Sequence, residues 1–290
     1  MDSPKTFKQE LPIKNIVMDD IDRFLREDVG KKGDITSDAL FTKQTARAVI
    51  IAKEDCVVAG LQEAQQVFKK VGASARLLFK DGAAVRKGNT VIEVQGLIRS
   101  ILKGERLALN IIGRMSGIAT ETKKIVQCCK KINPTVTIAA TRKTTPGFRM
   151  FEKKAIILGG GEPHRYGLYD APLIKDNHLK MIDSIEEAIM KIKRKLPGNP
   201  IEIEVENETD AIAAALLNVE VIMLDNFDPK TGRNVAQKIR QISPRILIEV
   251  SGGITADNIE QYASFADRIS LGCLTHSVKN KDFSLEIFKN

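Results

Sequence analysis

The sequence has few aromatic residues and cysteines, and it has no tryptophan. Aromatic residues make up 5% of the 290 residues, which disfavours a protein that binds single-stranded nucleic acid by stacking bases on rings. The four cysteines show no C-x-x-C spacing, so neither a disulfide framework nor a zinc site is expected. A reducing cytoplasm is therefore the expected compartment.

Long apolar runs are absent as well. No stretch approaches the ~18 apolar residues of a transmembrane helix, and the N-terminal segment MDSPKTFKQELPIK has no apolar signal core. We therefore expect no membrane partner. The composition, with 43% apolar and 28% charged residues, is that of a globular protein.

The net charge of +8 favours an anionic partner, which could be nucleic acid, acidic lipid or a phosphorylated metabolite. Solvated surface lysines, as in KIKRKLPG, would account for part of this excess. Cations that occur where predicted strands end would favour a specific anionic ligand over a merely solvated surface.

The first third of the chain differs from the rest. The segments ARAVIIAKEDCVVAGL and ARLLFKDGAAVRKGNTVIEVQG are short β-rich runs with turn signals, which predicts an antiparallel sheet, and LQEAQQVFKKVG between them has helical spacing. A long helix is predicted from Leu97 to about Ile132, with Gly113 or Gly117 as the points where it could bend.

From Val136 onward, strands and helices alternate, which predicts a parallel sheet. No G-x-G-x-x-G dinucleotide fingerprint is present, so we expect an incomplete parallel α/β barrel rather than an open sheet. The expected domains are a smaller α/β sandwich with an antiparallel sheet over residues 1–115, the barrel over 116–275, and a tail, 276–290, that packs back on the sandwich.

Charged and polar residues follow every predicted barrel strand, and the C-terminal strand ends of such a barrel carry the active site. In IEIEVEN, alternation puts Glu202, Glu204 and Glu206 on one face, which we expect to point toward the barrel axis. The residues expected at the mouth are Arg142, Lys143, Lys175, Asp176, Asn177, His178, Glu204, Asp225, Asn226, Ser251, Gly252, Gly253 and Gly272, with His164 and Arg165 from the loop EPHRYGLYD.

This mixture of charges predicts polyanionic ligands. SGGITADN, with a helix expected to be capped by Thr255, and SLGCLTHS offer glycine turns for a phosphate monoester. Arginine forks suit carboxylates, and Glu204 and Asp225 could hold hydroxyl groups or Mg²⁺. The run Gly159–Gly161 follows a helix, so we interpret it as a helix C-cap.

Several long motifs resemble the quinolinate phosphoribosyltransferase family, namely ERLALNIIGRMSGIAT, TRKTTPGFR, GGGEPHRYGLYDAPLIKDNH, EIEVEN, LDN and EVSGGI. The resemblance covers nearly the whole chain. It implies a carboxylating nicotinate-nucleotide pyrophosphorylase: phosphoribosyl pyrophosphate (PRPP) and quinolinate give nicotinate mononucleotide, pyrophosphate and CO₂, in NAD biosynthesis. It also implies Mg²⁺ bound with PRPP, and a homo-oligomer, either a dimer or a hexamer of dimers, without nucleic acid.

The resemblance also implies residue roles. Arg106, Arg142, His164, Arg165 and Lys175 would surround quinolinate and nearby phosphates, with Arg106 reaching the neighbouring subunit's site. Lys143 would lie near the reacting ribose and pyrophosphate, and Glu204 and Asp225 would hold ribose hydroxyls and Mg²⁺. The 5′-phosphate would be bound by Ser251, Gly252, Gly253 and Gly272.

One departure is Pro163, where many relatives have asparagine before the His-Arg pair, so the detail of this loop is open. Three alternatives remain at this point: a phosphoribosyltransferase for another aromatic acid such as nicotinate, a molybdenum-transport-associated relative, and a nucleic-acid-binding protein. The intact TRKTTPG and IKDNH segments disfavour the molybdenum-associated group. Acidic residues among the cations disfavour nucleic acid, because they would repel its backbone.

Overall fold

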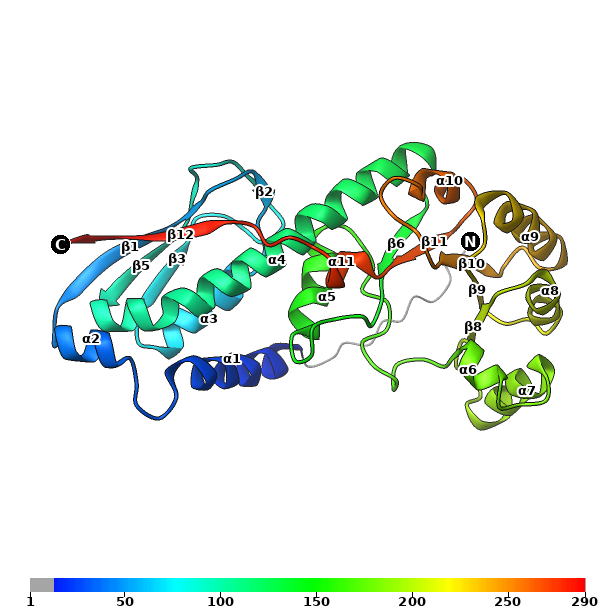
Figure 1. Cartoon of the computed structure of the whole chain (residues 1–290), viewed down its shortest axis with the longest axis horizontal. Coiled ribbons are helices and arrows are strands. Elements are labelled where there is room, and N and C mark those ends of the chain that lie inside the picture. Colours follow the sequence, from blue (N-terminus) through cyan, green and yellow to red (C-terminus); the bar gives the residue numbers. More distant parts are fainter. Residues whose placement is uncertain (1–12, 290) are drawn as a thin grey trace. The chain divides into compact units, whose positions relative to one another are not determined.

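The computed structural model describes the backbone of residues 13–289 and the side chains of residues 19–288, so most of the polar N-terminal segment lies outside it. The described chain forms two compact units. The barrel unit holds Lys124–Lys143 and Gly161–Cys273, and the sandwich unit holds residues 13–123, Thr144–Gly160 and 274–289. Figure 1 colours both along the sequence.

The barrel unit contains a six-stranded parallel sheet in the order β6-β11-β10-β9-β8-β7. This is the cyclic order of a barrel cut open between β6 and β7, which share no ladder in the described chain. The predicted fold class, an incomplete barrel beside an antiparallel sheet, is confirmed. The strands are β6 (Thr137–Ala140), β7 (Leu173–Ile174), β8 (Glu202–Val205), β9 (Val221–Asp225), β10 (Leu247–Ser251) and β11 (Arg268–Leu271).

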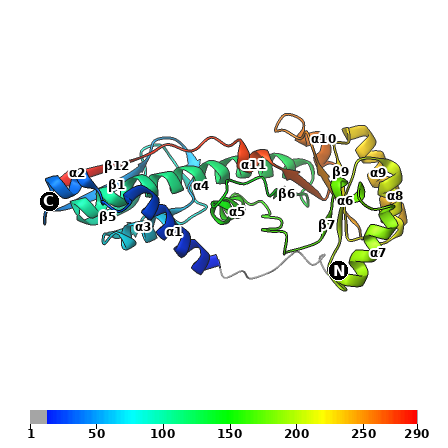
Figure 2. The same cartoon turned by 60° about the horizontal axis from the view of Figure 1, so that its bottom comes forward.

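Helices cover one side of this sheet, and Figure 2 shows α7, α8 and α9 beside one another along it. Ser184, Asn207 and Asp228 accept backbone N–H bonds at their N-termini, so local capping starts all three. The helices are α6 (Asp176–Leu179), α7 (Ile185–Lys195), α8 (Glu208–Leu216), α9 (Pro229–Ile242) and α10 (Ile259–Ala263), and α11 (Cys273–His276) follows β11.

Successive levels of the parallel sheet alternate between apolar and charged residues. Ile203, Ile222 and Ile248 are ladder partners, and all three are fully buried. At the next level, Glu249 is the partner of Arg268, and both are also buried. Because successive residues point to opposite faces of a strand, one face packs on helices and the other gathers charge.

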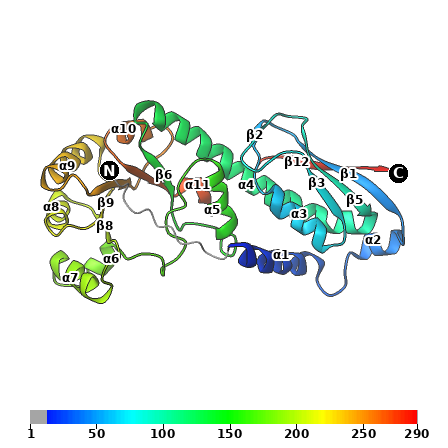
Figure 3. The same cartoon turned by 180° about the vertical axis from the view of Figure 1, so that it is seen from behind.

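The sandwich unit has a four-stranded antiparallel sheet in the order β12-β1-β5-β3. Figure 1 shows β12 of the C-terminal tail running beside β1, and α3 lies between α1 and β3 in Figure 3. The strands are β1 (Thr45–Ala52), β2 (Cys56–Val57), β3 (Ser74–Leu77), β4 (Ala84–Val85), β5 (Thr90–Leu97) and β12 (Phe283–Lys289), and the helices α1 (Ile13–Val29), α2 (Ile35–Leu40), α3 (Leu61–Lys70) and α5 (Arg149–Leu158).

Helix α5 belongs to the sandwich unit, whereas the limits expected from the sequence put it in the barrel. The physical reason is aromatic packing. The ring of Phe24 on α1 lies 5.8 Å from that of Phe148 and 5.7 Å from that of Phe151, and these last two rings stack at 4.5 Å.

The long helix α4 (Ile98–Ile132) runs through 35 residues without interruption. Gly113 and Gly117, expected as possible bend points, instead lie where the C-terminal tail crosses the helix. Lys281 N–H donates to Gly113 O at 3.0 Å, and a Cβ at Gly117 would collide with Lys279 O. None of the helices in the described chain, α4 included, is long and apolar enough to cross a bilayer.

We predict that Gly117→Ala destabilises the chain by about 1–3 kcal/mol, although alanine normally favours a helix, because the obstacle is backbone rather than a movable side chain. Gly104→Ala on the same helix is the matched control, since its Cβ would meet only side-chain atoms of Phe68 and Val71, at 3.1 Å or more. Thermal unfolding of both variants checks this. Equal melting temperatures would show that the tail does not need the close approach.

Candidate active site

The carboxyl ends of four neighbouring strands bring predicted site residues together. Asp225 and Ser251 are partners in the ladder between β9 and β10, and Ser251 Oγ donates a hydrogen bond to Asp225 Oδ1. Lys175, directly after β7, forms an ion pair with Glu204 of the adjacent β8. His178 Nδ1 accepts the Lys175 N–H at 2.9 Å and so fixes the start of α6.

The loop that carries His164 lies beside the free edge of β6. Glu162 N–H donates to Ile138 O at 2.8 Å, and Ala140 N–H donates to Glu162 O at 3.0 Å, which makes one rung of a parallel ladder. A single residue therefore takes the place of a strand where the barrel is open. His164 follows two residues later with a φ of 53°, in the left-handed region that non-glycine residues seldom adopt.

His164 is buried, and its ring lies between two carboxylates. Its Nε2 is 3.1 Å from Glu202 Oε2 and 3.6 Å from Glu249 Oε2, although neither contact is aligned as a hydrogen bond. Burial lowers the pKa of the imidazole, but the charge of Glu249 and the contacts with Glu202 outweigh it and raise the pKa to about 9. His164 is therefore expected to be a cation at neutral pH.

Glu249 is fully buried and paired with residues of β11. It accepts hydrogen bonds from Ser270 Oγ and from Arg268 Nη1, the latter at 3.0 Å. Burial raises the pKa of its carboxyl, but His164 and Arg268 outweigh this effect and hold the pKa well below its usual range. For Glu202, burial and the nearby charge of Glu249 raise the pKa.

Arg142 and Arg165, far apart in sequence, are close in space. Arg165 is buried, and its Nη1 donates to Ala171 O at 3.2 Å. Burial lowers the pKa of Arg165, Glu202 opposes this effect, and the charge of Arg142 lowers the pKa further. The two guanidinium groups are therefore close enough to repel each other, and the acidic residues of β8 lie near them.

Lys143 and Arg106 are two exposed members of the predicted set. Lys143 follows Arg142 in the barrel unit, and its N–H donates to Thr141 Oγ1 at 3.1 Å. Arg106 lies on α4 within the sandwich unit, and among the described side chains it has no ion pair or hydrogen bond, not even with Glu105. The roles of both residues stay predictions.

The glycines expected to bind phosphate differ from one another. Gly252 has a φ of 81° and packs so closely on Asn226 that any Cβ would collide, whereas a Cβ at Gly253 would meet nothing within 4 Å. The backbone at Gly253 is therefore open to a ligand. The helix expected to be capped by Thr255 begins only at Ile259, because Asn258 Oδ1 accepts the Thr255 N–H in a preceding turn.

The third glycine turn, Gly272, directly follows β11 and leads into the four-residue α11. Gly159 is the C-cap of α5, as expected, and Gly160 follows with a φ of 88°. The run of three glycines therefore ends a helix, and it contributes to the site only by leading into the His164 loop.

The sequence interpretation missed Glu162, Glu249, Arg268 and Ser270. A signal was present, since Glu249 and Arg268 are single charged residues within the otherwise apolar strands ILIEV and RISL. Such residues need buried partners, but the sequence does not say which strands are neighbours.

Two groups of side chains could be considered as ligands of a metal ion. His164, Glu202 and Glu249 offer donor atoms within 4.8 Å of one another. However, Arg268 already neutralises Glu249, and a protonated His164 has no lone pair at Nε2. Glu204 and Asp225 have only hard oxygen donors and suit Mg²⁺ better.

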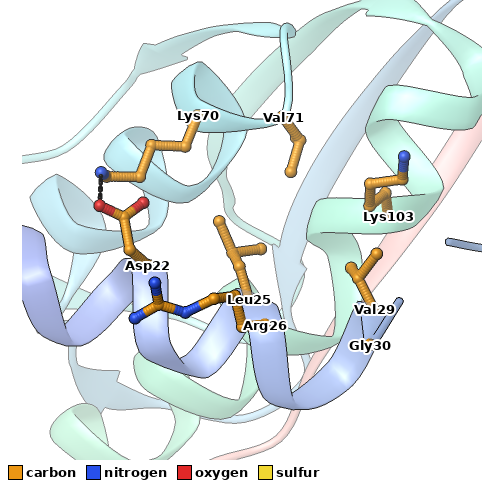
Figure 4. Close-up of a pocket in the computed structure, with 8 residues that line it drawn as sticks. All are labelled: Asp22, Leu25, Arg26, Val29, Gly30, Lys70, Val71 and Lys103. Atoms are coloured by element: carbon orange, nitrogen blue, oxygen red, sulfur yellow. Dashed lines mark hydrogen bonds and ion pairs between the residues drawn. The ribbon is translucent and has the colours of Figure 1, made fainter. Parts of the chain in front are cut away.

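A separate hollow of about 430 Å³ lies in the sandwich unit, between α1, the end of α3 and α4 (Figure 4). Its lining mixes apolar and charged side chains, and the ammonium group of Lys70 is paired with Asp22. None of the predicted site residues lines it. The lining residues are Asp22, Leu25, Arg26, Val29, Gly30, Lys70, Val71 and Lys103.

Comparison with known protein families covers most of the chain. Residues 34–116 match the N-terminal domain of quinolinate phosphoribosyl transferase, and residues 118–286 match its C-terminal domain. The junction between these matches lies within α4, close to the boundary expected from the sequence.

Individual relatives agree with this result. The chain is 42% identical over 260 residues to a probable carboxylating nicotinate-nucleotide pyrophosphorylase of Archaeoglobus fulgidus, covering 89% of this chain and 99% of that protein. It is 37% identical to the carboxylating nicotinate-nucleotide pyrophosphorylase of Rattus norvegicus, covering 84% and 82%.

Comparison with solved structures indicates the same family. The nicotinate-nucleotide pyrophosphorylase of Francisella tularensis superposes with a TM-score of 0.89 at 32% identity, covering 99% of this chain and all of that one. The resemblance stated from the motifs is confirmed, and so is the choice of an enzyme over a nucleic-acid-binding protein. The chain belongs to the quinolinate phosphoribosyl transferase family.

Proposed function

We propose that the chain transfers phosphoribosyl from PRPP to quinolinate with decarboxylation, giving nicotinate mononucleotide, pyrophosphate and CO₂. The observation that carries this proposal is that Arg142 and Arg165 lie close enough to interact electrostatically, next to Glu202 and Glu204 of β8. Both substrates are polyanions, which the cations would bind. Positive charge develops at ribose C1 as pyrophosphate leaves, and nearby carboxylates would stabilise it.

Quinolinate binding is assigned to Arg142, His164, Arg165 and Lys175. The two buried groups, His164 and Arg165, are held in place by protein contacts, whereas Lys175, which is part exposed, can exchange its pair with Glu204 for a substrate carboxylate. A planar acid with two carboxylates suits a site that combines planar arginine guanidinium groups with the compact cations of lysine and histidine. Arg106 of a second subunit would complete the set.

The 5′-phosphate is assigned to the loop Ser251, Gly252 and Gly253 with Gly272, where the open backbone at Gly253 allows close approach. Mg²⁺ would be held by Glu204 and Asp225 together with the pyrophosphate of PRPP. When bound, it would neutralise charge on the leaving pyrophosphate. Asp225 is already oriented by Ser251 and by Asn226 Nδ2, which donates to Oδ2 at 2.7 Å.

In the proposed reaction, the bond between ribose C1 and pyrophosphate breaks while Lys143 stabilises the leaving oxygens. Glu204 and Asp225 stabilise the positive charge that develops at C1, and the quinolinate nitrogen donates its electron pair to C1. The bond between ring C2 and its carboxylate then breaks, CO₂ leaves, and the electron pair stays at C2, where the adjacent pyridinium nitrogen stabilises it. A proton from water then adds to C2 and gives nicotinate mononucleotide. The protein positions and neutralises the reactants and needs no nucleophile of its own.

The cellular setting is also a proposal. All four cysteines, Cys56, Cys128, Cys129 and Cys273, lie in the described chain as free thiols, and a reducing cytoplasm fits them. A homodimer that shares its sites, alone or within a hexamer, fits the exposed and unpaired Arg106.

We predict that the purified chain converts quinolinate, PRPP and Mg²⁺ to nicotinate mononucleotide, measured by mass spectrometry, and that nicotinate does not replace quinolinate. Loss of one carboxylate would leave part of the cation cluster unpaired, and polar sites discriminate strongly against such analogues. Comparable turnover of the two acids would assign the chain to a different aromatic substrate.

We predict that Lys143→Ala and Glu204→Ala each lower kcat by roughly 10²–10³, the usual effect of losing one electrostatic contact in a transition state. Both should keep the wild-type melting temperature within a few degrees, because Lys143 is exposed and the ion-pair partner of Glu204, Lys175, is itself part exposed. The matched control is Lys180→Ala, which removes an exposed cation paired with Asp176 on α6. A control as slow as Lys143→Ala would mean that the loss of positive charge in general lowers kcat, and that Lys143 has no specific role.

We predict that Arg106 acts in a partner's site. Arg106→Ala and Lys143→Ala, each nearly inactive, are unfolded, mixed equally and refolded together. Under random pairing half the dimers are heterodimers with one intact site each, so about one quarter of wild-type activity should return. Subunit exchange is verified by mass spectrometry of tagged chains. Exchange without recovered activity would contradict a role in trans.

A further inference from the structure

The charges around His164 form a cluster of which the proposed reaction uses only His164 itself. Its anions are Glu162, Glu202 and Glu249, and its cations are His164 and Arg268. All but Glu162 are nine-tenths buried or more. Charges buried to this degree are costly, so their arrangement calls for a reason beyond packing.

Glu249 lies at the centre of the cluster. Its Oε2 is 3.0 Å from Arg268 Nη1 and 3.6 Å from His164 Nε2, and its Oε1 accepts from Ser270 Oγ. Both of its oxygens are therefore engaged, and the carboxylate cannot rotate away from the imidazole without breaking another contact. Glu249 is a fixed negative charge behind the ring.

The same cluster also fixes the backbone that bears His164. Arg268 Nη2 reaches Glu162 Oε1 at 3.3 Å, and Glu162 is the residue that bridges to β6. Arg268 thus joins the anion behind the ring to the loop that holds His164 at a φ of 53°. A strained backbone persists only where its surroundings determine it strongly, as they do here.

A buried divalent ion is the rival interpretation of His164, Glu202 and Glu249. Arg268 argues against it, because a guanidinium at 3.0 Å already supplies the positive charge that Glu249 requires. A purely structural ion network is the other rival. It would explain the pairing of Glu249 with Arg268, but it does not require an imidazole at the same place.

We propose that Glu249, fixed by Arg268 and Ser270, is a positioning residue that keeps His164 in its cationic form and orientation for binding a substrate carboxylate. This inference rests on the proposed role of His164 in binding quinolinate. Nε2 faces the two carboxylates, so Nδ1 is the ring nitrogen left for a ligand.

The expected pH behaviour follows from the groups around the ring. These are Glu202 on β8, Glu249 on β10 and Arg268 on β11, with Glu162 and Arg165 on the loop itself. The pKa of His164, at about 9, lies above its ordinary value of 6.5. The positive charge is therefore present at neutral pH and is lost as the pH rises through about 9.

The first experiment is an NMR titration of histidine-labelled protein. The chain has only three histidines, His164, His178 and His276, so His164→Asn identifies the signal. We expect His164 to titrate near pH 9 in the wild type, and to fall to or below 6.5 in Glu249→Gln, where burial acts with less opposition. A wild-type midpoint at or below 6.5 would overturn the inference even if Glu249→Gln failed to fold.

The second experiment measures quinolinate binding by calorimetry across the pH range. At pH 8, Glu249→Gln should raise the Kd by about 10- to 100-fold, as expected for losing a contact with a charged group. Affinity should recover as the pH falls below that variant's own His164 midpoint, and Glu249→Asp, which keeps the charge, should bind nearly as the wild type does. Recovery by acid would not follow from a structural defect.

The matched control is Glu63→Gln in the sandwich unit, which also removes a buried, ion-paired carboxylate, at 2.6 Å from Lys154. It should leave the His164 midpoint and the quinolinate Kd unchanged. If Glu249→Gln binds like the wild type at every pH, the positioning role is wrong. If the wild type itself fails to bind quinolinate, the proposed function is wrong, and the NMR titration still decides whether Glu249 sets the charge of His164.

Discussion

The barrel unit depends on charges that are buried together on one face of its parallel sheet. Glu249 has no exposed surface, and its charge is tolerated only because Arg268, Ser270 and His164 surround it. Removing any one partner would leave the others uncompensated in a medium that screens charge poorly. The neighbouring strand order, β10 beside β11, is therefore both a packing arrangement and an electrostatic requirement.

The fold could be predicted from the sequence because its determinants are local. Apolar runs separated by capped amphipathic helices give the alternation that makes a parallel sheet, and all six predicted barrel strands are present. The expectations that were wrong concern features that depend on contacts between segments far apart in the sequence. The glycines at 113 and 117 accommodate the C-terminal tail instead of bending α4, and α5 joins the sandwich unit through Phe24, neither of which has a local signal.

The residues of the candidate site also fall into those that local sequence patterns predict and those that depend on contacts between distant segments. Lys175, Asp225 and Ser251 could be placed at the barrel mouth because each directly follows or ends a strand, and the ends of parallel strands meet. Glu204, one residue before the end of β8, could be placed there by alternation along the strand. Glu249 and Arg268 lie inside strands, where a pattern of alternation says that they share a face but not what they contact. Their partners depend on which strands are neighbours and on the position of a loop residue, Glu162, at the barrel's open edge.

The two kinds of ion pair in the site have different consequences for binding. In the Lys175–Glu204 pair the lysine is part exposed, so in the proposed function a substrate anion and a metal ion would separate its members more easily than those of a fully buried pair. The pair between Glu249 and Arg268 is buried on both sides and cannot be exchanged in this way. In the proposed function, His164 would be held as a cation before the substrate arrives, and Lys175 would be released from Glu204 only when the substrate binds. Such preorganisation lowers the reorganisation needed at the moment of reaction, which is where electrostatic catalysis gains most of its effect.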